Sequence, residues 1–302
     1  MPFRVTDATS NSQLVERIAE QRLRISDAQE KVASGKRINR PSDDPFGAAA
    51  VIEIRNSQAA ITQFGRSAKT VDNALSVADG ALNSYDQALN RAQTLVSQGL
   101  SGFSRPDGRQ ALASELDGLR QTVLNVANTR NGDQYVFGGT RQDVPPVDQT
   151  TEALAATPTA PQLIQVEADA PPLAAGVTAE AMFANIDGTV FQALNDAAKA
   201  LRGTGDPVAD ESTLKTAMQQ LQTFAQQSIA AHTTIGKNLD AVEAATDRNA
   251  TASLALEATA QDKESADFAQ SSVDLVEANR ALEAILQSES QTNRHSLLDL
   301  LG

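Results

Sequence analysis

Residues 37–47 read Arg37-Ile38-Asn39-Arg40-Pro41-Ser42-Asp43-Asp44-Pro45-Phe46-Gly47 and lie between two stretches with helical periodicity. Asp44 followed by Pro45 predicts a helix N-cap and a proline at the first helical position, where its missing N–H costs nothing. Asp43 and Asp44 also place negative charge at the positive end of that helix. Because the residue before a proline favours extended backbone, Pro41 and Pro45 predict a break. We therefore expect a capped joint between two helices.

Apolar residues recur before this joint, and again near the end of the chain, with the 4/3 spacing of a coiled coil. Gly35, beside Lys31 and Lys36, predicts the end of the first helix. Both repeats contain small or polar core positions, which would make an isolated pair of helices marginal, so we interpret them as assembly surfaces. The N-terminal seam is Leu14, Ile18, Ile25 and Val32, and the C-terminal seam is Phe268, Leu275, Leu282 and Ile285.

The strongest periodic signal follows the joint, where apolar residues recur every seven positions from Ile54 to Val96. A strict heptad indicates a supercoiled helix packed against others. At 1.5 Å per residue this helix would be roughly 65 Å long. Similar spacing returns in residues 112–126 and 214–242. The predicted bundle core is Ile54, Ile61, Leu75, Leu82, Leu89, Leu116, Leu119, Val123, Leu221 and Leu239.

The heptads stop between residues 134 and 190, where six of the eleven prolines fall between Pro145 and Pro172. Short strands are predicted at 135–139 and 163–167. No proline follows Pro207, so one helix could cover most of 212–290. The predicted fold is mainly α: an elongated antiparallel helical bundle formed by the N- and C-terminal halves, with a small β-containing or irregular inserted domain. The predicted segments are an N-terminal assembly helix (1–40), the bundle's first half (41–133), the inserted domain (134–190), the bundle's second half (191–262) and a C-terminal assembly helix (263–302).

Composition excludes several classes of function. The formal net charge is −13, which argues against nucleic acid and anionic membranes as main partners. Residues 1–40 carry eight basic and five acidic side chains, whereas 262–302 carry three and eight, so the two ends could attract each other or neighbouring subunits. No apolar run approaches the roughly 20 residues of a membrane span, and the N-terminus predicts no cleavable signal peptide.

Nothing in the sequence supports catalysis. The two histidines, His232 and His295, have no second metal ligand at helical spacing, and there is no cysteine. Gly203-Thr204-Gly205 follows a helix and lacks a third glycine, so it predicts a helix end rather than a phosphate site. We expect no enzyme activity, no catalytic, cofactor-binding or metal-binding residues, and a core or interface role for His232.

Three stretches resemble the flagellin superfamily. They are Ser34 to Pro45 with the helix before it, the segment Asn131-Gly132-Asp133-Gln134-Tyr135-Val136-Phe137-Gly138-Gly139, and the C-terminal helix from Glu264 to Gly302. The Pro-Ser-Asp-Asp-Pro form of the first is similar to that of the superfamily's hook–filament junction subunits. Flagellins, which build the bulk of the filament, usually carry Ala-rich residues at Pro41, Ser42 and Pro45.

The resemblance implies a structural subunit of the bacterial flagellum that joins hook-side proteins to the flagellin filament. It also implies an extracellular location reached unfolded through the flagellar type III apparatus. The implied partners are like subunits in a ring, a neighbouring hook-associated junction protein, flagellin, and an export chaperone at the C-terminal helix. The alternatives are flagellin itself and, from another class, a helical coiled-coil signalling rod, whose heptads would run unbroken through residues 134–190.

Overall fold

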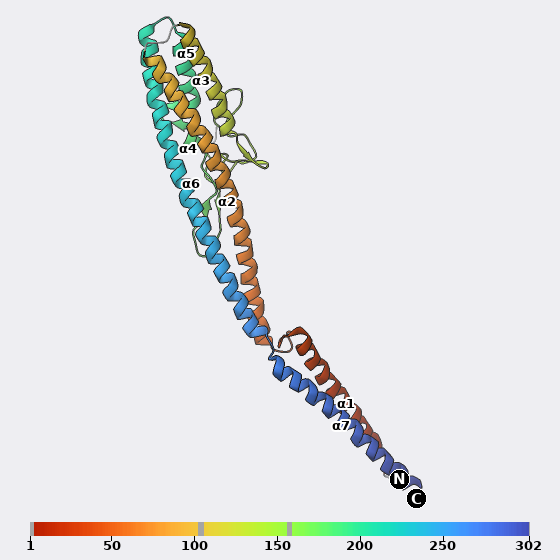
Figure 1. Cartoon of the computed structure of the whole chain (residues 1–302). Helices are drawn as coiled ribbons and strands as arrows, with labels where there is room; N and C mark the ends of the chain where they lie inside the picture. The colour runs from red at the N-terminus through yellow and green to blue at the C-terminus, as the bar shows by residue number, and fades with distance from the viewer. Residues whose placement is uncertain (1–2, 102–105, 156–158, 302) are drawn as a thin grey trace. The chain divides into compact units, whose positions relative to one another are not determined.

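Long helices dominate the chain, as predicted (Figure 1). The computed structural model describes residues 3–101, 106–155 and 159–301. By backbone contacts the chain forms two units, unit 1 with Met1–Ala60 and Ser253–Gly302, and unit 2 with Ile61–Ala252. The limits of these units fall inside two long helices, so the five-segment division above remains a proposal. The helices are α1 (Phe3–Ser34), α2 (Pro45–Leu100), α3 (Pro106–Ala127), α4 (Ala179–Phe183), α5 (Val190–Arg202), α6 (Pro207–Glu264) and α7 (Phe268–Leu301).

Unit 2 holds the hydrophobic core, formed where α2, α3, α5 and α6 pack together. The heptad of α2 explains this, because one side chain per two turns points to the same face of a supercoiled helix. Phe183 lies at the centre of an aromatic cluster, with ring centroids 5.1 Å from Tyr85 and 5.5 Å from Phe137. Of the predicted core residues, the structure buries Leu75, Leu82, Leu89, Leu116, Val123 and Leu221 and half-buries Ile54, Ile61, Leu119 and Leu239.

The inserted region has less strand than predicted. Within residues 106–155 and 159–301, the ladders are three two-residue antiparallel pairs: β1 (Arg130–Asn131) with β2 (Gln134–Tyr135), β3 (Leu163–Ile164) with β4 (Leu173–Ala174), and β5 (Ala184–Asn185) with β6 (Gly188–Thr189). Most of the region is therefore irregular backbone. Such backbone needs hydrogen-bond partners from elsewhere, because a buried unpaired peptide group is costly.

Those partners include a row of side-chain amides on α6. Each donates to a backbone carbonyl of the inserted region, at distances of 2.9–3.3 Å. The spacings of 7, 11 and 11 residues return nearly to the same face of an α-helix, so the four amides form one line. The row pairs Gln220 with Asp187, Gln227 with Ala184, Asn238 with Ala174 and Asn249 with Val166.

In unit 1, α1 and α7 lie side by side with the two ends of the chain at the same end of the pair (Figure 1). The Gln21 side chain donates to the Ala278 carbonyl at 3.0 Å across the pair. The predicted continuous helix over 212–290 is wrong, because residues 265–267 separate α6 from α7. Asp267 begins α7 by accepting hydrogen bonds from Ala269 N and Gln270 N, which satisfies amides that a helix start leaves free.

Candidate functional site: the helix joint

The joint between α1 and α2 is built on two aspartates with different roles. Asp44 Oδ1 accepts a hydrogen bond from Gly47 N at 2.9 Å, so Asp44 caps α2 and Pro45 is its first residue. Asp43 instead turns back and accepts from Asn39 N at 3.0 Å and Arg40 N at 2.7 Å. It therefore holds the turn before the helix rather than the helix itself, which corrects the expectation that both aspartates serve the helix end.

Gly47 fits closely against this cap, a feature that the sequence did not indicate. A Cβ added at Gly47 would meet the Asp44 carboxylate and would lie 2.6 Å from Cδ1 of the buried Ile38. Arg37 completes the joint, with one guanidinium nitrogen 3.1 Å from Asp44 Oδ2. The cap, the apolar contact and the ion pair therefore share one small space.

A second connection lies against the first. Arg37 N donates to Glu264 O at 2.6 Å and Ala266 N donates to Gly35 O at 2.9 Å, which makes an antiparallel bridge between Lys36 and Ser265. The two segments that link the terminal helices to α2 and α6 are thus paired with each other. Sequence reasoning missed this pairing, although Asp267 before Phe268 is an N-cap signal that could have indicated the break.

Glu264 is the charged centre of this pairing. Its side chain is mostly buried, and its carboxylate contacts Lys36 Nζ at 2.7 Å and Arg55 Nε at 3.1 Å. The Lys36 ammonium first, and the Arg55 guanidinium after it, lower the pKa of Glu264. The Gly47 amide and then Arg37 likewise lower the pKa of Asp44. Both carboxylates are therefore ionised at neutral pH.

The structure brings most of the two predicted seams together. Leu14, Ile18, Ile25 and Val32 on α1 are half-buried, as are Leu275, Leu282 and Ile285 on α7. Between them lie buried small or polar residues, Gln21, Ala28, Ser271 and Ala278. Phe268 differs, because it is 65% exposed at the first residue of α7, where α1 has already given way to the joint.

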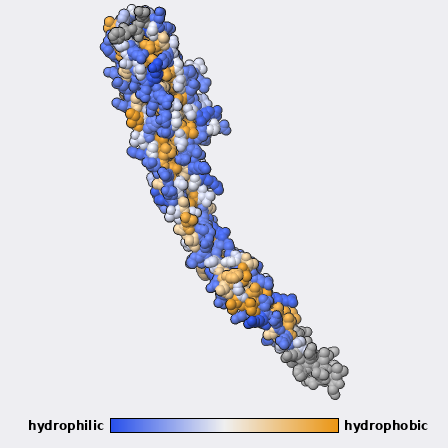
Figure 2. Space-filling view, in the orientation of Figure 1, coloured by the Kyte–Doolittle hydropathy of each residue, from blue (hydrophilic) through white to orange (hydrophobic). Residues whose placement is uncertain are grey.

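Both terminal helices carry a second apolar surface that their pairing does not cover. Val15 and Leu23 on α1 are exposed, as are Val273 and Val276 on α7. Figure 2 shows hydrophobic residues gathered on the visible face of this pair. Among the described residues, Arg17 and Arg22 on α1 and Glu283 on α7 make no ion pair, and neither do Asp274 and Glu277, which line the hollow between the two helices. The expected attraction between the two ends therefore produces no ion pair between α1 and α7 among the described side chains.

Replacing Gly47 by alanine is expected to loosen the start of α2. The new methyl group must displace the Asp44 carboxylate or Ile38, and loss of an N-cap should speed amide exchange in the first turn roughly fivefold. Hydrogen exchange by mass spectrometry over residues 45–52 measures this. Gly65→Ala is the control, because a Cβ there meets nothing within 4 Å and should slightly stabilise α2. Equal exchange in Gly47→Ala and the wild type would show that the cap tolerates the methyl group.

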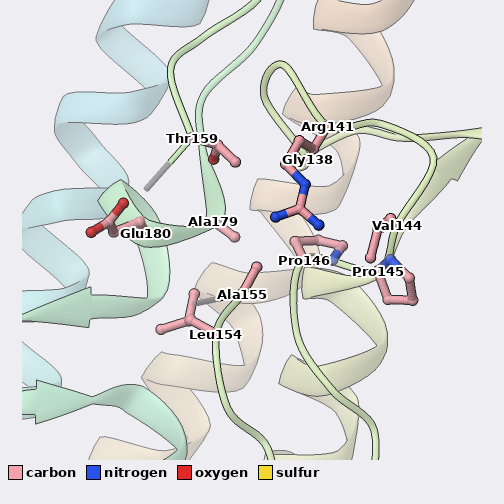
Figure 3. A pocket seen from close by; sticks show the side chains of 10 residues that line it. All are labelled: Gly138, Arg141, Val144, Pro145, Pro146, Leu154, Ala155, Thr159, Ala179 and Glu180. Atoms are coloured by element: carbon pink, nitrogen blue, oxygen red, sulfur yellow. The ribbon is translucent and has the colours of Figure 1, made fainter. Parts of the chain in front are cut away.

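Two other candidate sites are a histidine between two aspartates and a small cavity. His232 lies between Asp79, 2.9 Å from Nδ1, and Asp86, 3.0 Å from Nε2, and so joins α6 to α2. Figure 3 shows a cavity in the inserted region lined by Arg141, Pro146 and Leu154. Its volume of about 20 Å³ suits one or two waters rather than an organic cofactor.

The described residues hold neither a metal-binding cluster nor a membrane-spanning helix. Within 3–101, 106–155 and 159–301, no three His, Cys, Asp or Glu side chains converge to hold a metal ion. Over the same ranges, none of the helices has the length and apolar character needed to cross a membrane.

The fold and the joint together define a class of protein. It is a protein of long helices in which the N-terminal and C-terminal helices pair with each other. A charged joint connects the two linking segments, and the outer faces of the paired helices remain apolar and exposed. Residues 5–141 match the family described as the bacterial flagellin N-terminal helical region. This match includes all of the α1–α2 joint.

Individual relatives agree with this match. Flagellar hook-associated protein 3 of Salmonella typhimurium is 30% identical over 123 residues, which are 40% of this chain and 39% of that protein. Flagellin B of Helicobacter pylori is 31% identical over 38% of this chain and 23% of its own length. The crystal structure of Xanthomonas campestris FlgL shares the fold, with a TM-score of 0.62 at 18% identity over 68% of this chain and 98% of that one.

Residues 5–141, somewhat less than half of the chain, are thus similar to the N-terminal helical region of the bacterial flagellins. The alignments span about two fifths or less of the length of these curated relatives. The inserted region beyond residue 141 lies outside the family match.

Proposed function

We propose that this chain is the subunit that joins the flagellar hook to the flagellin filament, as a structural protein without enzyme activity. The observation that carries the proposal is the pair of terminal helices, α1 and α7, each with an outer apolar stripe and unpaired charges. Exposed apolar patches commonly mark interaction surfaces, so these stripes favour association with another protein chain. The stronger similarity to hook-associated protein 3 than to flagellins favours the junction over the bulk filament.

The outer surfaces of α1 and α7 are both apolar, which supports like subunits as partners. The α1 surface joins Val15, Ile18 and Leu23 to the cation Arg22, and these residues line one hollow. The α7 surface carries Val273 and Val276, whereas Asp274 and Glu277 line the hollow between α7 and α1. An α1 of one copy against an α7 of the next would bury apolar area, a contact that closes into a ring if the rotation permits.

The remaining partners and the location follow from the same proposal. The subunit would contact a neighbouring hook-associated junction protein on one side and flagellin on the other. An export chaperone would cover the C-terminal seam before assembly, because that seam is apolar and cannot be buried without a partner helix. The subunit would be extracellular, exported through the flagellar type III apparatus. The joint residues 37–45 would hold the assembling helices in register with the bundle.

The alternatives make different predictions. A flagellin would form the filament itself, and the similarity to Flagellin B keeps that reading as the runner-up. A signalling rod needs unbroken heptads, which the irregular region between α3 and α5 interrupts.

Deletion of the gene separates these functions. For a junction subunit we expect cells that keep hooks, lack filaments and release unpolymerised flagellin into the medium, measured by electron microscopy and immunoblotting of culture supernatant. Complementation with the intact gene is the control and should restore filaments. Absence of flagellin from both cells and medium, with hook-associated proteins still in place, would instead identify the chain as flagellin.

A further inference from the structure

Glu264 is a carboxylate at the end of α6 that contacts both the connecting segment and α2. Its side chain meets Lys36 from the connection and Arg55 from α2, while its backbone oxygen accepts from Arg37 N. The Arg37 guanidinium adds a hydrogen bond to the Lys263 carbonyl at 3.2 Å. Three cations from the N-terminal side of the joint therefore meet the last turn of α6.

Removing the charge of Glu264 would leave the joint without an anion at this position. Asp44 already caps α2, and Asp43 already accepts hydrogen bonds from two backbone amides. Asp267 is held by the first turn of α7. Lys36, which is half-buried, and Arg55, which is exposed, would lose a mostly buried partner, and hydrogen bonds to charged groups are the stronger ones.

We propose that Glu264 is a charge-dependent latch, which fastens the two connecting segments to each other while it is ionised and lets them separate when its charge is removed. Separation here means loss of the Lys36–Ser265 bridge with the helices on both sides still folded. Such local opening is possible because few buried apolar contacts hold the segments together, Ile38 being the buried apolar side chain on the N-terminal side. The latch concerns the free chain and does not depend on the proposed place in the flagellum.

The sign of the pH dependence follows from the charges that face Glu264. Because Lys36 and then Arg55 lower its pKa below the usual 4.5, the latch is fully closed above about pH 4.5 and opens as the pH falls through the lowered value. The charged groups in contact with it are Lys36 in the connection and Arg55 on α2; Arg37 and Asp44 pair with each other in the same joint, and Lys263 and Asp267 flank Glu264 along the chain.

The test uses the purified full-length protein and the variant Glu264→Gln. The peptide bonds after Lys36 and Arg37 are trypsin sites inside the bridge, and we expect them to be cut about tenfold faster in the variant at pH 7.5. Cleavage after Arg91 in unit 2 and the thermal melt followed by circular dichroism should not change. Glu257→Gln is the matched control, because Glu257 lies two turns earlier on α6 and contacts the uncharged Gln58 at 2.9 Å.

A second measurement follows hydrogen exchange of residues 35–40, corrected for the intrinsic effect of pH. The protection lost in Glu264→Gln at pH 7 should shrink as the pH falls through the lowered pKa of Glu264, since the wild type then loses the same charge. Cleavage in Glu264→Gln no faster than in Glu257→Gln would overturn the latch. So would a difference that persists unchanged at acid pH, since it would mean that Glu264 acts by shape rather than by charge.

Discussion

Replacing Leu275 and Leu282 together by aspartate is expected to abolish incorporation of the chain into the flagellum. Both side chains are half-buried in the C-terminal seam, and a carboxylate there would lie against the apolar N-terminal seam without a partner. The fold of unit 2 should be untouched, because its core lies entirely between residues 68 and 245. Filament counts by electron microscopy in complemented deletion cells should fall at least about a hundredfold, because removing two carboxylates from water in the paired helices is costly.

The control for this double variant adds the same charge to the outside of the same helix. Asn279 and Ala284 are both exposed on α7, so Asn279→Asp with Ala284→Asp should build far more filaments. The seam variant should keep the wild-type circular dichroism melt of unit 2 and should bind the proposed export chaperone more weakly. Normal filaments in the seam variant would remove the assembly role from Leu275 and Leu282.

Replacing Phe183 by alanine is expected to destabilise unit 2 by about 3–5 kcal/mol. Its ring is fully buried and makes edge-on contacts with Tyr85 and Phe137, so truncation removes both apolar area and two aromatic pairs. Burial raises the pKa of the Tyr85 hydroxyl, as expected for a cluster that excludes water. Urea denaturation followed by circular dichroism measures the loss in the free energy of unfolding.

Phe46→Ala is the matched control, since the Phe46 side chain is 91% exposed at the start of α2. The same truncation there should change the free energy of unfolding of unit 2 by less than about 0.5 kcal/mol. Phe183→Leu should fall between the two. A loss for Phe183→Ala no larger than that for Phe46→Ala would mean that the aromatic cluster does not stabilise unit 2.

The helices and the start of α2 could be predicted because their causes are local. The heptad from Ile54 to Val96 determines a long packed helix, and Asp44 before Pro45 carries its own capping chemistry. The mainly α fold follows from these patterns and is confirmed. Gly47 could have been singled out as well, but only knowledge of where Ile38 lies shows why a side chain does not fit there.

What could not be predicted depends on contacts between distant residues. Glu264 looks like an ordinary charge at the end of a helix until Lys36, 228 positions away, is placed beside it. The break at 265–267 contains no proline and no glycine, so local signals favoured one continuous helix. The strands predicted in the inserted region are shorter in the structure for a related reason, because four of its carbonyls accept from side chains of α6 and others bond within turns rather than to long neighbouring strands.

The row of amides on α6 has a consequence for how this protein can diversify. Gln220, Gln227, Asn238 and Asn249 donate to main-chain carbonyls, which every amino acid possesses. A helix that recognises peptide backbone imposes little constraint on which side chains the attached segment displays. The exposed side chains of the inserted region can therefore change during evolution while its hydrogen bonds to α6 are kept. Substitutions there need no compensating change in the helices that hold the region.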